Sequence, residues 1–199
     1  HSERTPEYLR TTDKKLNGFQ IWVGLPKHLE QAEPTFHHIE AHELPVWEEG
    51  DIQFKLIAGD AFGKKSPVPV HSKLFFIEIK TKTAQKISIG KDLYGEAAMY
   101  VLNGTVSTDG NSYGSKQLLV AKNTKLCEFE MSENATVYLF GGEPFDEERF
   151  IFWNFVNSSK EIIDQAKVDW NDQNHEAFPL VPGDDDEFVP LPKSILNRK

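Results

Sequence analysis

The stretch LFFIEIK at residues 74–80 carries the plainest structural signal in the chain. Phe75, Ile77 and Ile79 stand at every second position, and most of the residues between and after them are polar. Successive side chains of a β-strand point to opposite faces of the sheet. The alternation therefore predicts a strand with one face toward a core and the other mostly toward solvent.

Similar short apolar runs, rich in β-branched and aromatic residues, recur on both sides of this stretch and are separated by Gly, Asn, Asp or Pro. Their close spacing leaves no room for helical crossovers, so the pattern predicts an antiparallel all-β sandwich or barrel. Between two of the runs, Asn103-Gly104 is a strong hairpin signal and predicts a tight turn. The expected strands cover residues 19–25, 35–39, 52–58, 74–80, 85–89, 97–102, 104–107, 117–121, 125–130 and 135–140.

One helix is expected at about residues 159–171, where Ser158 and Glu161 have the spacing of a capping box. Ile162, Ile163, Ala166 and Trp170 would share its apolar face, which should dock on the sheet. The segment after it contains four prolines and an acidic run, which predicts an extended strap. Its spaced apolar residues, Phe188, Val189 and Leu191, indicate that the strap is pinned to a surface.

Composition excludes several classes of partner. The 199 residues include 31 acidic and 22 basic side chains, and the formal net charge of −9 would repel nucleic acid and anionic lipid. No apolar stretch approaches the roughly 18 residues of a membrane span. Cys127, the single cysteine, fits a core position and a reducing cytoplasm. Because the sequence begins with His1 rather than Met, we expect that upstream residues have been removed.

Four segments in order carry a family resemblance: HSE at 1–3, GFQIWVGLPK at 18–27, KLIAGDAFGKKSPV at 55–68 and LFGGEPF at 139–145. With the helical segment and the proline-rich tail, they make the chain resemble bacterial members of the pirin family. The resemblance implies cupin barrels, or double-stranded β-helices, in tandem. It assigns residues 1–45 to the end of a first, metal-binding cupin, residues 46–157 to a second, metal-free cupin, and residues 158–199 to a closing helix and tail.

The resemblance also implies a mononuclear metal ion, usually iron, held in the first barrel by three histidines and a glutamate. Its His-x-Glu element maps onto His1 and Glu3. Residues i and i+2 of a strand share a face, so both side chains could reach one ion. Imidazole and carboxylate suit Fe(II) or Mn(II), with Ni, Zn or Cu as alternatives. This chain alone supplies half of the implied ligands, so we expect it to hold metal weakly or not at all.

The remaining candidate residues favour plainer interpretations. If residues 35–39 continue as a strand, His38, Glu40 and His42 share a face; a metal-binding face is one interpretation, and a polar surface is the preferred one. In the second barrel, Ala97 stands where a cupin motif has its glutamate, and the neighbouring strands lack histidine. We therefore expect an apolar, metal-free interior. The glycines of GGEP at 141–144 indicate a turn with positive φ.

Three functions remain open. The first is a metal-dependent quercetin 2,3-dioxygenase, in which Glu3 serves as ligand or base. The second is a non-catalytic, metal-responsive regulator that binds a protein partner such as a transcription factor or metabolic enzyme. The third is a structural remnant without activity. As an enzyme, the chain by itself is expected to be inactive.

Overall fold

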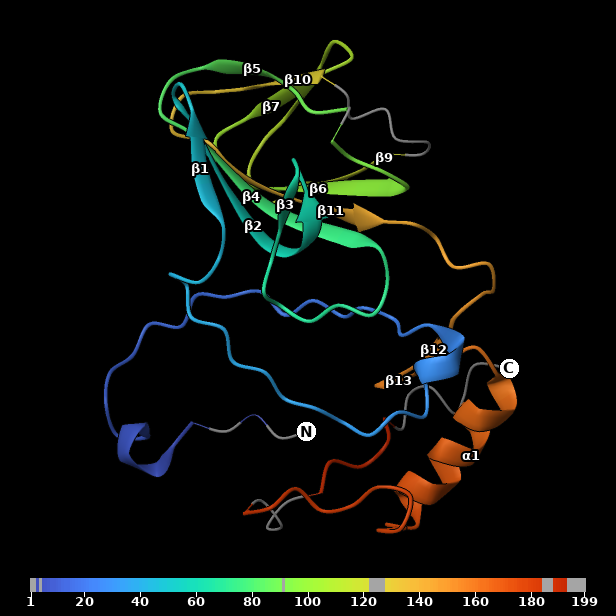
Figure 1. The fold of residues 1–199 in the computed structure, drawn as a ribbon. Coiled ribbons are helices and arrows are strands. Elements are labelled where there is room, and N and C mark those ends of the chain that lie inside the picture. Colours follow the sequence, from blue (N-terminus) through green and yellow to red (C-terminus); the bar gives the residue numbers. More distant parts are fainter. Residues whose placement is uncertain (1–2, 4, 91, 122–127, 184–187, 193–199) are drawn as a thin grey trace. The chain divides into compact units, whose positions relative to one another are not determined.

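The computed structural model describes residues 3, 5–90, 92–121, 128–183 and 188–192 (Figure 1). The chain forms two compact units. One comprises Gln31–Asp146, and the other combines His1–Glu30 with Glu147–Lys199. No helix among the described residues is long and apolar enough to cross a membrane.

The unit of Gln31–Asp146 is built around a seven-stranded antiparallel sheet (Figure 1). In spatial order its strands are β1 (Val46–Glu49), β2 (Ile52–Ala61), β4 (Leu74–Thr81), β11 (Thr136–Gly142), β6 (Glu96–Asn103) and β9 (Leu118–Ala121), with β3 (Lys64–Lys65) paired to β2.

A second, four-stranded antiparallel sheet has the order β5 (Gln85–Ser88), β10 (Glu128–Met131), β7 (Val106–Thr108) and β8 (Asn111–Tyr113). Both sheets contribute side chains to one hydrophobic core, in which Leu56 and Met99 come from the first sheet and Val106 and Phe129 from the second. Burial of these apolar faces against each other is the main force that holds the two sheets together.

Most of the expected strands are confirmed. Those predicted within residues 52–58, 74–80, 85–89, 97–102, 104–107, 117–121, 125–130 and 135–140 correspond to β2, β4, β5, β6, β7, β9, β10 and β11. Cys127 and its expected core position lie outside the described residues. The strands that the sequence did not predict are all short, from two to four residues.

In β4 the predicted alternation is confirmed on one face only. Phe75, Ile77 and Ile79 are at most 1% exposed. Glu78, however, is not on a solvent face: it is 7% exposed. Its carboxylate is buried because Tyr138 and two lysines surround it, as described below.

The Asn103-Gly104 turn is present, but it does not join a hairpin. Gly104 has φ +79°, and a Cβ there would lie 2.5 Å from the Cβ of Ala135, so only glycine fits. The strands on either side, β6 and β7, belong to different sheets and do not pair with each other. The turn thus carries the chain from one sheet to the other.

The turn predicted at the glycines of GGEP is wrong, and these glycines are needed for another reason. Gly141 and Gly142 lie within β11, and their φ angles are not positive. A Cβ at Gly141 would lie 1.9 Å from the backbone oxygen of Glu96, and one at Gly142 would lie 2.5 Å from that of Lys73. These glycines are required because neighbouring backbones approach closely here.

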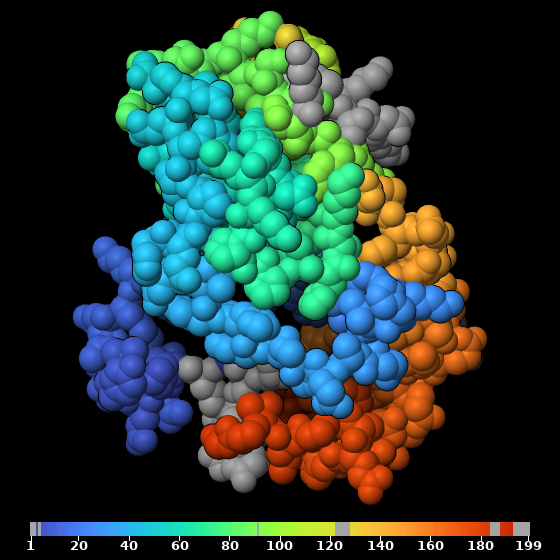
Figure 2. Space-filling model, viewed as in Figure 1, coloured from blue at the N-terminus to red at the C-terminus, as the bar shows by residue number. Residues whose placement is uncertain are grey.

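The strands predicted at residues 19–25 and 35–39 are wrong. The described residues before β1 contain two short 3₁₀ helices, Glu7–Leu9 and Lys27–Leu29, and no strand. A strand needs a neighbour to satisfy its backbone groups, and no described segment pairs with either stretch. Their apolar side chains therefore stay uncovered, Phe36 being 89% exposed. In the space-filling view the residues around position 36 lie uncovered in light blue (Figure 2).

In the other unit, β12 (Phe150–Phe152) and β13 (Phe155–Asn157) form a ribbon that contacts α1 (Lys160–Asn171). The predicted helix is confirmed, and Ile163 is its buried residue, although Ile162 is 43% exposed. The cap is Ser159 rather than Ser158: its hydroxyl accepts a hydrogen bond from the backbone N–H of Ile162 at 3.3 Å.

The expected pinning of the tail is confirmed at Phe188 and Val189. The indole N–H of Trp170 donates to the backbone oxygen of Val189 at 2.9 Å. Its ring stacks on Phe188 with the centroids 5.5 Å apart. An aromatic cluster with Trp153, Phe155 and Phe178 surrounds this contact.

Candidate functional site

Glu3, the predicted metal ligand and base, is exposed and holds a specific polar contact. The side-chain amide of Gln20 donates from Nε2 to Oε1 of Glu3 at 2.8 Å. His1, the other predicted ligand, lies outside the described residues. Whether the two side chains share a metal ion thus stays a prediction.

The chemistry of Glu3 fits a metal ligand. Carboxylates that bind metal ions are commonly held by a hydrogen bond from a second residue, and Gln20 provides one. Yet within the described ranges no three or more His, Cys, Asp or Glu side chains gather closely enough to hold an ion. Glu3 would need His1 and further ligands to complete a site.

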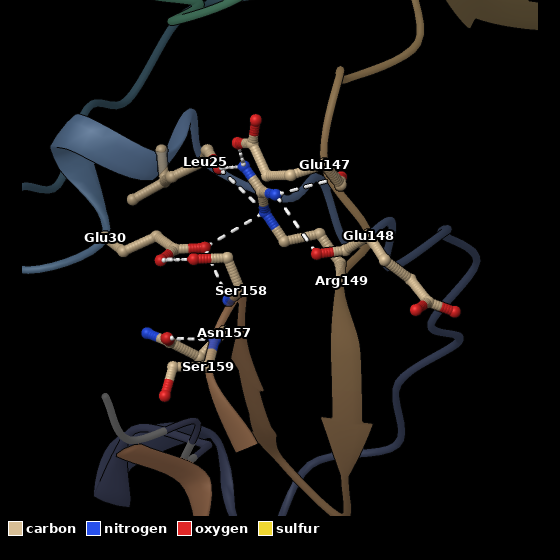
Figure 3. A network of polar contacts seen from close by, with 8 residues as sticks. All are labelled: Leu25, Glu30, Glu147, Glu148, Arg149, Asn157, Ser158 and Ser159. Carbon is tan, nitrogen blue, oxygen red and sulfur yellow. Dashed lines mark hydrogen bonds and ion pairs between the residues drawn. The ribbon is translucent and has the colours of Figure 1, made fainter. Parts of the chain in front are cut away.

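The N-terminal segment of this unit, up to Glu30, is anchored at its far end, residues 25–30, by a buried ion pair (Figure 3). Arg149 Nε lies 3.0 Å from Glu30 Oε1, with side-chain exposures of only 13% and 8%. The guanidinium also donates from Nη2 to the backbone oxygen of Leu25 at 2.9 Å and pairs with Glu147 at the same distance. One side chain thereby holds both ends of residues 25–30.

Ser158, which lies two residues before α1, also contributes to this anchor. Its backbone N–H and its hydroxyl donate to the two carboxylate oxygens of Glu30, each at 2.8 Å (Figure 3). Ser158 thus binds Glu30, while Ser159 caps the helix. The sequence offered no local signal for the anchor, because its partners stand 128 positions apart.

The interior between the two sheets is filled with apolar side chains, as predicted. Ala97, at the position of the cupin motif glutamate, is 3% exposed and belongs to the core. The buried side chains include isoleucine, valine, methionine, phenylalanine and leucine, and Tyr94 packs against them while only partly buried. Such a lining is typical of a structural core. The absence of metal from this barrel stays a prediction.

Tyr94 packs against this core, and the pKa of its phenol is raised. Its hydroxyl donates to the backbone oxygen of Leu74 at 2.7 Å and lies 3.1 Å from that of Asp60. Burial, and then the negative charge of Asp60, raise the pKa of Tyr94 to about 12. The phenol therefore stays protonated at neutral pH and acts as a structural donor, not as a base.

Glu78 forms a second polar cluster, on the face of β4 opposite the core residues. Its Oε2 accepts a hydrogen bond from the Tyr138 hydroxyl at 2.7 Å. Its Oε1 lies 2.9 Å from Lys80 Nζ and 3.5 Å from Lys55 Nζ. The Oε1 contacts lack the geometry of a hydrogen bond, so we regard them as charge pairing.

Burial pushes the pKa of Glu78 upward, but the contacts with Lys80 and Tyr138 and the charge of Lys55 outweigh it and lower the pKa below the ordinary 4.5. Burial, and then the bond to Glu78, raise the pKa of Tyr138 to about 12. The cluster is an ionised, internally paired group that stabilises the sheet, and it presents no acid or base poised near neutral pH.

The histidine face proposed for residues 38–42 is not formed, because the segment is not a strand. His38 Nε2 lies 3.0 Å from Glu40 Oε1, and both side chains are well exposed. The preferred prediction of a polar surface holds for these two residues. An open hollow of about 580 Å³ lies beside them, lined by Thr35, Phe36, His37, His38, Ile39, Val68, Pro69 and His71.

Comparison with known proteins identifies the family. Residues 76–176, which are half of the chain, match the family described as the pirin C-terminal cupin domain. The chain belongs to the pirin family. The predicted family and the all-β cupin fold are thereby confirmed.

Relatives and solved structures agree with this membership of the pirin family. A pirin-like protein of Caulobacter vibrioides is 41% identical over 97% of the chain and 65% of its own length. A provisionally named quercetin 2,3-dioxygenase of Pseudomonas aeruginosa is 27% identical over 80% of the chain and 50% of its own length. The crystal structure of a quercetin 2,3-dioxygenase from Acinetobacter baumannii superimposes with a TM-score of 0.74 at 27% identity, covering 86% of this chain and 56% of that one.

The chain thus spans between half and two-thirds of the length of these pirin relatives. The division into a cupin remnant, a second cupin and a closing tail stays a prediction, and the two compact units have other boundaries, at residues 30/31 and 146/147.

Proposed function

We propose that the whole protein is a metal-dependent oxidoreductase that opens the ring of a quercetin-like flavonol with O₂. The observation that carries this proposal is the likeness in fold, over 86% of the chain, to the quercetin 2,3-dioxygenase of Acinetobacter baumannii. The provisional name of the Pseudomonas aeruginosa relative supports the same substrate class. On this proposal the protein acts in the cytoplasm, in agreement with its single cysteine.

The metal ion would be Fe(II), with Mn, Ni, Zn or Cu as alternatives, bound by His1, Glu3 and further ligands of the whole protein. When bound, it would supply positions for substrate and O₂. On this proposal, the described residues contribute to the site by orienting the carboxylate of Glu3. The hydrogen bond from Gln20 to Glu3 supports that role. Glu3 serves as a ligand or as the base for a flavonol hydroxyl.

The test is oxygen uptake with quercetin by the whole protein, after metal removal and again after addition of Fe(II). We expect uptake only with the metal, and loss of uptake in Glu3→Ala. The matched control is Glu7→Ala, which removes an exposed carboxylate of the same segment and should leave uptake unchanged. Bound iron without uptake with any flavonol would refute the proposed reaction.

The second candidate is a non-catalytic regulator that binds a protein partner. The apolar filling of the core between the two sheets, which is typical of a structural core, agrees with it. The same oxygen measurement separates the candidates, because a metal-loaded protein that consumes no oxygen with flavonols would point to the regulator.

A further inference from the structure

We propose that Gln20 is a positioning residue that orients the carboxylate of Glu3 for metal binding. The inference rests on the proposed metal site and adds one residue to it. Its basis is the hydrogen bond of 2.8 Å from Gln20 Nε2 to Glu3 Oε1, which joins two residues 17 positions apart.

The chemistry of the amide suits this task. A primary amide donates a hydrogen bond without carrying charge, so it brings no positive charge that would repel a cation at Glu3. A lysine or arginine at the same place would pair with the carboxylate and compete with the metal ion. Outer hydrogen bonds of this kind fix the orientation of a ligand and tune its affinity.

The position of Gln20 in the sequence supports a specific role. It is the polar member of the run FQIWV at residues 19–23, whose other side chains are apolar. Phe19 and Ile21 on either side have apolar side chains that are 49% and 41% exposed. Gln20 is thus the residue of this run whose side chain offers a carboxylate a neutral amide donor.

The competing interpretation is a surface contact that only ties down the segment. Such a bond contributes about 1 kcal/mol to stability and should have no effect on metal affinity beyond that. The two interpretations predict different metal affinities for a variant that lacks the amide donor of Gln20 but keeps the length of its side chain.

The experiment measures Mn(II) binding to the whole protein by competition with a chromophoric chelator. Gln20→Met keeps the length of the side chain and removes the donor, whereas Gln20→Asn keeps the amide and shortens its reach. We expect Gln20→Met to weaken Mn(II) binding by about 10- to 100-fold and Gln20→Asn to weaken it less. Gln165→Met, on the exposed side of α1, is the matched control and should bind like wild type.

Two further readouts separate positioning from folding. The melting temperature of the metal-free variants should be lowered by no more than the loss of one hydrogen bond, about 1 kcal/mol, explains. The electron paramagnetic resonance spectrum of saturating Mn(II) should change in Gln20→Met, since the ligand geometry changes, and should not change in Gln165→Met. If Gln20→Met does not fold, Gln20→Asn decides the question by the same measurements.

The outcomes are distinct. Wild-type binding with an unchanged affinity and spectrum in Gln20→Met would overturn the role of Gln20 and leave the metal site standing. Absence of Mn(II) binding in the wild type, or equal binding by Glu3→Ala, would overturn both proposals. Weaker binding with a changed spectrum, and a melting temperature lowered by no more than the loss of one hydrogen bond explains, would establish Gln20 as the positioning residue.

Discussion

Arg149 and Glu30 form a buried ion pair, with Nε 3.0 Å from Oε1, that fastens the N-terminal segment to the ribbon of β12 and β13 (Figure 3). Glu30 also accepts two hydrogen bonds from Ser158, and Arg149 donates to the backbone of Leu25. The segment that carries Glu3 is therefore held at its far end by a satisfied polar network.

Replacement of Arg149 by Met should destabilise this unit by about 3 kcal/mol, because removal of one partner leaves the carboxylate of Glu30 buried without its counter-charge. The urea midpoint followed by tryptophan fluorescence measures the effect. Lys82→Met is the matched control: it removes an exposed ion pair with Glu48 and should change the midpoint little. A small effect of Arg149→Met, equal to that of Lys82→Met, would contradict the anchoring role.

Replacement of Glu78 by Gln should destabilise the protein at pH 7 and much less in acid. The folded pKa of Glu78 is below 4.5, so its ionised form contributes stability above that value. The contribution disappears as the pH falls through the folded pKa. Melting temperatures from pH 7 down to pH 3 should show the difference between variant and wild type shrinking below about pH 4.5. A difference that stays constant over this range would refute the charge pairing.

Tyr94 and Tyr138 should ionise later than an ordinary tyrosine, because the pKa of each is about 12 rather than 10. Since folding favours their neutral forms, their contribution to stability is complete below pH 10 and is lost as the pH rises through 12. The phenolate absorbance of the folded protein measures this ionisation. Tyr94→Phe and Tyr138→Phe should each remove one late-titrating group. Unchanged titration in either variant would show that its tyrosine is not one of them.

Replacement of Gly59 by Ala should destabilise the cupin barrel far more than the same change at Gly63. Both glycines have positive φ, +77° and +66°, so both variants incur backbone strain of about 1 kcal/mol. Only at Gly59 would the new Cβ meet backbone, 1.8 Å from the oxygen of Leu74, whereas Gly63 has open space. Thermal melting compares the two. Equal losses would show that the close approach of β2 and β4 is unimportant.

The sequence predicted what depends on local periodicity. Alternation placed Phe75 and Ile77 in the core because strand geometry repeats every two residues. The apolar face of α1 was predicted through Ile163 for the corresponding reason in a helix. These signals need no knowledge of distant partners.

Features that depend on distant partners escaped prediction. The Asn103-Gly104 turn could be placed, but not the sheet to which the next strand belongs. Residues 19–25 have a strand-like composition, yet no described neighbour pairs with them. The burial of Glu78 requires two lysines and a tyrosine from three strands, and alternation alone assigns it to solvent.

The candidate site was predicted in the same uneven way. Glu3 was proposed as a ligand through the His-x-Glu motif, whereas its hydrogen bond with Gln20 was not predicted, although Gln20 lies in the quoted motif GFQIWVGLPK. Motif spacing identifies ligands that share a strand face. It does not identify the side chain that orients a ligand from 17 residues away.

The most direct test of the metal-dependent function is the iron content of the whole protein. The protein is loaded with Fe(II) under anaerobic conditions, excess ion is removed, and bound iron is measured by inductively coupled plasma mass spectrometry. The proposal predicts a single iron ion per chain in the wild type and in Glu7→Ala, and little or none in Glu3→Ala. A wild-type protein without iron, or a Glu3→Ala variant that retains it fully, would contradict the account.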